Sequence, residues 1–91
     1  MAYSGQKTIT AAGTAEKLGT QDVAGPLMVK ALDTNTSVVA LGNVSEDVTV
    51  SNGLRLEAGD VVVFDFVGNL ASLWLDSAVN GEGVSWIILS G

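Results

Sequence analysis

Residues 60–66, Asp-Val-Val-Val-Phe-Asp-Phe, are the most β-prone segment of this 91-residue chain. β-Branched and aromatic residues favour strands. The run Val61-Val62-Val63-Phe64 is apolar at every position, whereas a strand with one face in water normally alternates. The end of the segment 84–89, Val-Ser-Trp-Ile-Ile-Leu, has the same character. Both runs therefore predict strands whose two faces are covered, either by a further layer of the domain or by another subunit.

The rest of the chain reads as short strands between turns. Eleven glycines interrupt the apolar runs, as in antiparallel sandwiches and barrels. Strands are predicted at 6–12, 15–18, 27–32, 37–41, 54–56, 60–66, 72–76 and 84–89. Turns are predicted at 33–36, 52–53, 57–60 and 80–83, where Asn, Asp and Gly concentrate. A single helical turn is predicted at 68–71, and 42–53 is the longest irregular stretch, in which Val48 and Val50 form either a short strand or a covering loop.

These elements predict one all-β domain over residues 1–91. Seven to eight short strands are typical of a small two-sheet antiparallel β-sandwich or a jelly-roll-like barrel. A chain of this length buries a thin core, so small domains often gain stability from disulfides, metals or oligomerisation. The chain contains neither cysteine nor histidine. Oligomerisation is therefore the route that the composition leaves open.

The charge content is low for a free monomer. Charged residues make up 15% of the chain, against about 25% in an average soluble protein. Either neutral polar side chains keep the surface soluble, or partner subunits cover part of it, and we favour the second interpretation. The net charge is −6, and the four basic residues are scattered singly, at Lys7, Lys17, Lys30 and Arg55. Direct binding of nucleic acid needs clustered basic residues and is not expected.

No residue set predicts catalysis. Without histidine or cysteine, the usual activated nucleophiles lack a base or a thiol. The acidic residues stand mostly at turns and strand ends, where solvated carboxylates are ordinary. The segment Asp33-Thr34-Asn35 starts like a calcium-binding loop, but the required Gly and Glu positions hold Val38 and Val44. We therefore expect no enzyme activity, catalytic residue, cofactor or metal site.

No targeting segment is predicted. Residues 1–7 lack the apolar run of a secretory signal, and no stretch approaches the roughly 20 apolar residues that cross a bilayer. We expect synthesis in a cytoplasm and no contact with a membrane.

The candidate functional residues are those expected to contact partner subunits. They come from the two apolar strands and from the aromatic residues outside them: Tyr3, Val61, Val63, Phe64, Trp74, Trp86 and Ile88. Trp74 stands on the opposite face of its strand from Leu73 and Leu75. For both tryptophans, packing in the core or at a subunit interface is the preferred interpretation, and stacking against a sugar is the alternative.

The order of several strand and turn segments resembles small β-rich virion proteins of tailed bacteriophages, of the capsid cement (decoration) or head-fibre type. The likeness covers roughly residues 27–89. It consists of 29–32 (Val-Lys-Ala-Leu), 35–36 (Asn-Thr), 39–43 (Val-Ala-Leu-Gly-Asn), 51–60 (Ser-Asn-Gly-Leu-Arg-Leu-Glu-Ala-Gly-Asp), 69–76 (Asn-Leu-Ala-Ser-Leu-Trp-Leu-Asp) and 81–85 (Gly-Glu-Gly-Val-Ser).

The resemblance implies a cement protein that binds the outer capsid lattice and stabilises the head by bridging major capsid subunits. It implies a homotrimer made in the host cytoplasm and located on the outer surface of the virion. The alternative is a head- or tail-fibre module that recognises a host surface glycan. The N-terminal residues depart from the pattern, and residues 1–5 are interpreted as an extended arm that reaches a neighbouring subunit.

Overall fold

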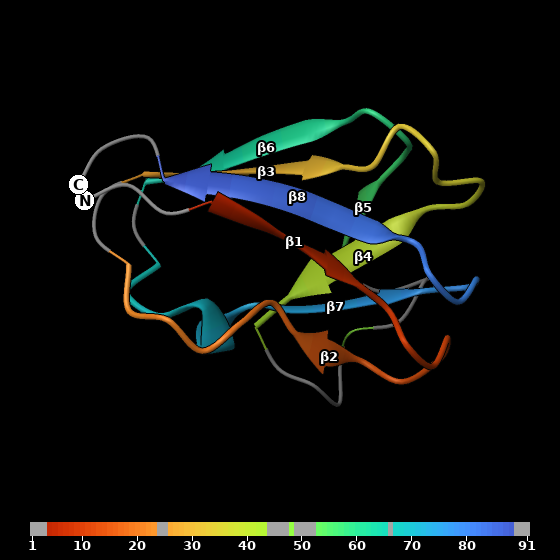
Figure 1. Ribbon diagram of the computed structural model, residues 1–91, viewed down its shortest axis with the longest axis horizontal. Coiled ribbons are helices and arrows are strands. Elements are labelled where there is room, and N and C mark those ends of the chain that lie inside the picture. The colour runs from red at the N-terminus through yellow and green to blue at the C-terminus, as the bar shows by residue number, and fades with distance from the viewer. Residues whose placement is uncertain (1–3, 24–25, 44–47, 49–52, 66, 89–91) are drawn as a thin grey trace.

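The computed structural model describes residues 4–23, 26–43, 48, 53–65 and 67–88. They form two four-stranded antiparallel sheets stacked face to face (Figure 1). Sheet A has the order β1 (Ser4–Thr8), β8 (Gly83–Ile88), β3 (Leu27–Ala31) and β6 (Val61–Phe64). Sheet B has the order β2 (Glu16–Lys17), β7 (Trp74–Ser77), β4 (Val39–Gly42) and β5 (Leu54–Leu56).

The strand pairing is that of a jelly roll. β1 pairs with β8, β2 with β7, β3 with β6 and β4 with β5, each pair antiparallel. These four pairs form one long antiparallel ribbon, and two further pairs, β3 with β8 and β4 with β7, complete the two sheets. An antiparallel ribbon of eight strands wrapped into two sheets is the jelly-roll architecture. The predicted fold class, an all-β two-sheet sandwich of this type, is confirmed.

Most of the predicted elements are present, with shifted ends. The strand at 54–56 has the predicted bounds, and the predicted helical turn is the 3₁₀ turn η1 (Leu70–Ser72). Asn69 caps this turn, because its side-chain oxygen accepts a hydrogen bond from the N–H of Ala71 at 2.8 Å. The first strand begins earlier than predicted, and Ser4 and Gly5 pair with Ile87 and Trp86. These two residues therefore belong to β1 and not to an arm, whereas residues 1–3 lie outside the described residues.

The core lies between the sheets and follows the alternation of each strand. Sheet A contributes the inward side chains of β3 and β8, which are Leu27, Val29, Ala31, Val84, Trp86 and Ile88. Sheet B contributes Val39, Leu41, Leu56 and Leu75. Successive side chains of a strand point to opposite faces, so the residues between these positions face outward.

Part of the outer face of sheet B is covered by the chain itself. Ala40 points away from the core cluster, yet it is fully buried. Val48 is also buried and lies against Gly42, where an added Cβ would collide with its side chain. The stretch 42–53 was expected to form either a short strand or a covering loop, and at Val48 the covering loop is observed. Val50 lies outside the described residues.

The turn before β6 fixes the register of that strand. Gly59 has φ +84°, and the N–H of Asp60 donates to the carbonyl of Glu57 at 2.9 Å. The N–H of Gly59 donates to the carbonyl of Ala31, and the N–H of Ala31 donates to the carbonyl of Asp60. This is a β-bulge with glycine in the left-handed conformation, a position that strongly favours glycine. It aligns Ala31 with Asp60 and so determines which groups of β6 face β3.

Candidate functional site

The strongest candidate for a functional surface is an apolar patch on the outer side of sheet A. Val61, Val63 and Ile87 are 50%, 47% and 44% exposed. The pairing places Met28 between Val63 and Ile87 on the same face of the sheet. We call Met28, Val61, Val63 and Ile87 the apolar patch.

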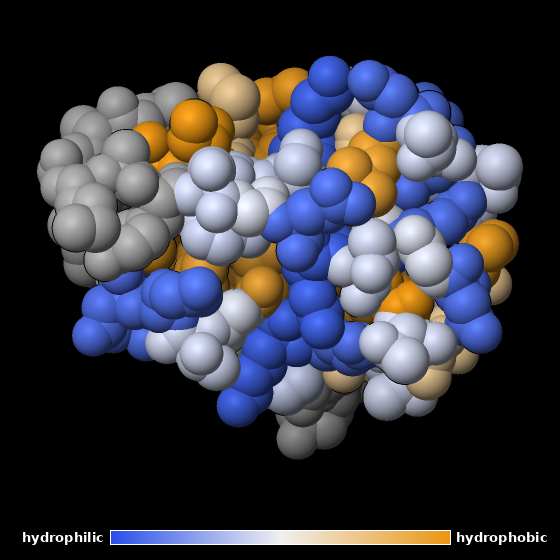
Figure 2. Space-filling view, in the orientation of Figure 1, coloured by the Kyte–Doolittle hydropathy of each residue, from blue (hydrophilic) through white to orange (hydrophobic). Residues whose placement is uncertain are grey.

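Polar side chains border the apolar patch. Lys30 lies between Val61 and Ser85 in the register, and its ammonium is 3.5 Å from the carboxylate of Asp33. On the far side of β8, β1 presents Ser4 and Gln6. The face drawn in Figure 2 is mixed, with hydrophobic areas separated by hydrophilic side chains. The register nevertheless places Met28 directly beside Val63 and Ile87, and neighbouring apolar side chains with a polar border are typical of a protein interaction site.

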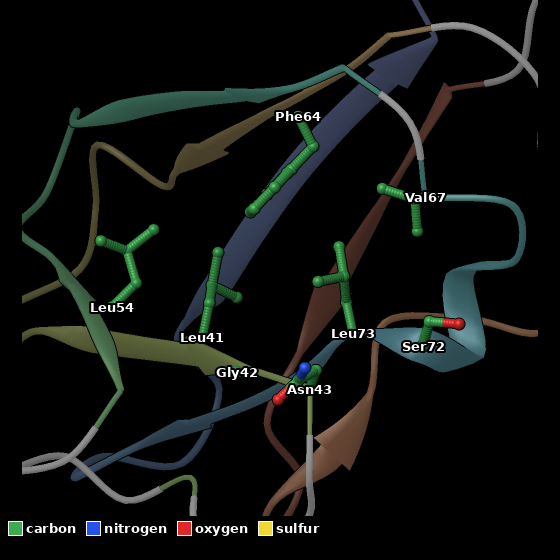
Figure 3. A pocket seen from close by; sticks show the side chains of 8 residues that line it. All are labelled: Leu41, Gly42, Asn43, Leu54, Phe64, Val67, Ser72 and Leu73. Atoms are coloured by element: carbon green, nitrogen blue, oxygen red, sulfur yellow. The ribbon is translucent and has the colours of Figure 1, made fainter.

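A pocket of about 380 Å³ opens beside the apolar patch, between the two sheets. Figure 3 shows Phe64 of β6 pointing from sheet A toward Leu41 of β4, with Leu54 of β5 at one side and Val67 at the other. Its remaining lining comes from Gly42, Asn43, Ser72 and Leu73. The lining is mostly apolar, as in sites that receive an apolar group of a ligand or partner. It offers hydrogen-bonding side chains only at Asn43 and Ser72 among the lining residues.

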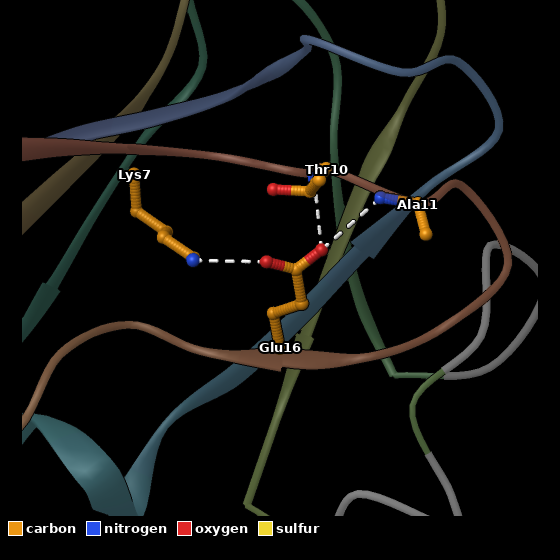
Figure 4. A network of polar contacts seen from close by, with 4 residues as sticks. All are labelled: Lys7, Thr10, Ala11 and Glu16. Atoms are coloured by element: carbon orange, nitrogen blue, oxygen red, sulfur yellow. Dashed lines mark hydrogen bonds and ion pairs between the residues drawn. The ribbon is translucent and has the colours of Figure 1, made fainter.

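The opposite side of the sandwich is closed by a polar network between β1 and β2 (Figure 4). The Lys7 ammonium is 2.9 Å from one carboxylate oxygen of Glu16. The other oxygen accepts hydrogen bonds from the N–H groups of Thr10 at 2.8 Å and Ala11 at 3.3 Å. The hydrogen bond from Lys7 is the largest cause that lowers the pKa of Glu16 below its usual 4.5. Burial, the next in size, raises this pKa, and the N–H groups of Thr10 and Ala11 lower it further.

A second polar network joins the start of β8 to the loop after β3. The buried carboxylate of Glu82 accepts hydrogen bonds from the N–H and hydroxyl groups of both Thr36 and Ser37. Burial by itself raises the pKa of Glu82, but these hydrogen bonds outweigh it, and the pKa lies below the usual 4.5.

The amide of Asn35 completes this network by pairing with the main chain of Gly83. Its Nδ2 donates to the Gly83 carbonyl at 2.9 Å, and its Oδ1 accepts from the Gly83 N–H at 3.1 Å. The sequence indicated only turns at these positions, because nothing local in 33–36 or 80–83 shows that the two turns meet. The network holds a loop in place, and both carboxylate oxygens of Glu82 accept hydrogen bonds in it.

The predicted contact residues lie in different parts of the structure. Val61 and Val63 lie in the apolar patch, and the half-buried Phe64 lines the pocket. Trp86 and Ile88 are 7% and 3% exposed and belong to the core. Their assignment as contact residues is therefore corrected. They occupy the inward positions of β8, and the Trp86 ring packs so closely on Gly5 that a Cβ there would lie 2.9 Å from it. Tyr3 lies outside the described residues.

Trp74 has a surface position of its own. It lies on the outer face of sheet B, is half-buried, and pairs with Lys17 and Gly42 on the neighbouring strands. The Lys17 ammonium is 5.6 Å from the centre of a Trp74 ring, within the range of a cation–π interaction. One face of that ring therefore already has a partner.

The sequence reasoning missed Met28 and did not single out Ile87 within its apolar strand, and these two residues complete the apolar patch. Met28 is apolar and alternates with Leu27 and Val29, so the sequence already indicated that its side chain lies on the opposite face from theirs. Ile87 alternates with Trp86 and Ile88 in the same way. The sequence did not show which of the two faces of this strand points into the core.

The described residues hold no group of three or more Asp or Glu side chains placed to bind a metal ion. Within the same residues, no helix is long and apolar enough to cross a membrane. Comparison with family models, with curated proteins and with solved structures finds no match. The arguments for function therefore come from the surface itself.

Proposed function

We propose that this protein is a bacteriophage capsid cement protein, which binds the outer capsid lattice as a homotrimer and bridges major capsid subunits. The apolar patch is the observation that carries the proposal. Four apolar side chains share the outer face of sheet A, and three of them are 44–50% exposed among the described residues, in a chain with only 15% charged residues. The order of strand and turn segments, which resembles small virion proteins of tailed phages, supplies the class of partner.

The proposed mechanism is stabilisation by binding. A protein that binds the assembled shell and not its separated subunits stabilises the shell by its binding free energy. A trimer would contact several capsid subunits at once, so weak single contacts would give strong attachment. In this proposal the protein has no catalytic step, which agrees with the absence of histidine and cysteine from the sequence.

The test uses phage particles whose genome encodes this chain. We expect the chain to be present in purified virions, and we expect particles from a deletion strain to release DNA at a lower temperature. Adding the purified chain back should restore the original release temperature. Two results would refute the cement function: deletion-strain heads that release their DNA at the same temperature as normal heads, or purified virions that lack the chain.

The alternative function is a head- or tail-fibre module that binds a host surface glycan. It requires an aromatic ring that is free to stack on a sugar, and Trp74 is the candidate. The Lys17 ammonium near one face of that ring makes Trp74 a less open platform. Saturable binding of the chain to host cell-wall polysaccharide, lost in Trp74→Ala, would favour the fibre module over the cement protein.

A further inference from the structure

The four edge strands of the sandwich differ in their charges. Strands at sheet edges present unpaired main-chain groups, and proteins commonly protect them with charged side chains. β1 carries Lys7, β2 consists of Glu16 and Lys17, and β5 carries Arg55. β6 consists of Val61, Val62, Val63 and Phe64 and carries no charge. Figure 1 shows β6 at the margin of sheet A, and among the strands that the structure describes its one neighbour is β3.

The register shows which groups of β6 are free. In an antiparallel pair, residues alternate between positions that face the neighbouring strand and positions that face away. The bulge aligns Ala31 with Asp60 as a hydrogen-bonded position, so Val62 and Phe64 face β3 with their N–H and C=O groups. The N–H and C=O groups of Val61 and Val63 therefore point to the free edge.

We propose that the β6 edge binds an extended segment of another protein, which adds to sheet A as a fifth strand. This inference rests on the proposed binding function and specifies how the partner is held. In such strand addition, main-chain hydrogen bonds give affinity and pockets for alternate side chains give specificity. Outward side chains of the added segment would extend the apolar patch beside Val61 and Val63. Inward ones would approach the apolar pocket that Phe64 lines.

Charge defines the ends of the bound segment. Asp60 and Asp65 flank β6 and are both exposed. A second copy of β6 at this edge would bring the Asp60 and Asp65 carboxylates of both copies together with no basic side chain in either strand, and repulsion among like charges disfavours this pairing. A foreign segment with a basic residue at each end, separated by four β-prone residues, matches this edge. The occupant is therefore a basic-flanked strand of the partner and not another copy of this chain.

A synthetic peptide tests the proposal on the intact protein. The probe is Gly-Lys-Val-Thr-Val-Thr-Lys-Gly, with blocked ends, and binding is followed by calorimetry and by the amide NMR signals of β6. One control peptide has glutamate in place of both lysines, and another is N-methylated at the alternate residues that would face β6. We expect the lysine peptide to bind with shifts centred on Val61 and Val63, and each control peptide to bind at least tenfold more weakly.

Matched variants separate main-chain pairing from side-chain contact. Val63→Pro removes an outward N–H without removing a bond to β3, and should weaken binding of the lysine peptide at least tenfold. Val63→Thr keeps the N–H and the β-branched shape, and should change binding less than threefold. Asp65→Lys should abolish most of the preference for the lysine peptide over the glutamate peptide, because each peptide then meets one attractive and one repulsive end. If Val63→Pro does not fold, the N-methylated peptide and Asp65→Lys decide the question.

Three results would overturn the inference. They are equal binding of the N-methylated peptide, no binding of the lysine peptide at millimolar concentration, and a dimer of the free protein that Val63→Pro abolishes. The last result would assign the edge to self-association. Peptide binding without any effect of the chain on capsid stability would refute the cement function alone. Normal capsid attachment of folded Val63→Pro would refute the edge-binding inference alone.

Discussion

At the scale of single residues, close approach of backbones explains the need for particular glycines. A Cβ at Gly83 would collide with the Lys7 carbonyl and lie 2.7 Å from the Thr8 Cα, because β1 crosses directly beside it. Gly81 has open space around its Cα, but its φ is +86°. One glycine is therefore required by sterics, and the other by its backbone conformation.

We expect Gly83→Ala to destabilise the protein by about 3 kcal/mol or more, because β1 cannot move away without losing its pairing with β8. Gly81→Ala should cost about 1–2 kcal/mol, the penalty for a side chain in the left-handed region. Urea unfolding of the two variants measures both values. Equal costs would mean that the close contact of β1 with Gly83 is not present in solution.

Asn35 provides a second prediction at this scale. Asn35→Ala removes both side-chain hydrogen bonds to the buried Gly83, and we expect a loss of about 1–3 kcal/mol in unfolding free energy. The exposed neighbour Thr34 is the control, and Thr34→Ala should change stability by less than about 0.5 kcal/mol. Thermal and urea unfolding of both variants compare the two positions.

At the scale of elements, each strand of sheet A has one face in the core and one in solvent. The run 61–64 looked too apolar for this arrangement, and the structure places Val62 and Phe64 against the core while Val61 and Val63 are half exposed. The same division separates Ile87 from Ile88 in β8. The apolar character of the outer positions is therefore not explained by the fold of this chain and is available to a partner.

The neighbouring isoleucines of β8 test this division directly. Ile88→Thr places a hydroxyl in the core and should cost about 2–4 kcal/mol, whereas Ile87→Thr should stay within about 0.5 kcal/mol. The two changes are chemically identical, so their difference in urea unfolding measures the facing of the strand. A reversed or equal result would show that the register of β8 is wrong.

The two glutamate networks predict acid sensitivity of the elements they join. Glu16 and Glu82 have pKa values below 4.5 in the folded protein, so each carboxylate contributes stability above its unfolded pKa. This contribution is lost as pH falls below about 4.5 and through the folded pKa. Unfolding free energy measured from pH 7 to pH 3 should therefore fall on the acid side, and less steeply in Glu82→Gln. A Glu82→Gln curve parallel to that of the unmodified protein would contradict this assignment.

At the scale of the whole molecule, the sandwich has one closed side and one open side. The Lys7–Glu16 pair bridges the edge strands β1 and β2. On the other side, β5 and β6 are joined at the turn 57–60, and between them the pocket opens at Leu54 and Phe64. The uncharged edge, the apolar patch and the pocket thus lie on the same side of the fold.

Hydrogen exchange can map this asymmetry. The strands β8 and β3 have a neighbour on both sides, and their amides should exchange last, near the rate of global unfolding. The outward amides of Val61 and Val63 should exchange fast, whereas those of Val62 and Phe64 should be slower. Uniform protection along β6 in the dilute free protein would show that another strand already covers its edge.

The sequence by itself determined the strands, the turns and the absence of histidine and cysteine chemistry, because these depend on residue type and on neighbours a few positions away. Leu54–Leu56 and the turn at Leu70 were predictable for that reason. Only the tertiary structure decided that Ser4 pairs with Ile87, that Asn35 meets Gly83, and that Trp86 faces the core. Pairing between strands at opposite ends of the chain leaves no local signal, and it is this pairing that makes β6 an edge and exposes the apolar patch.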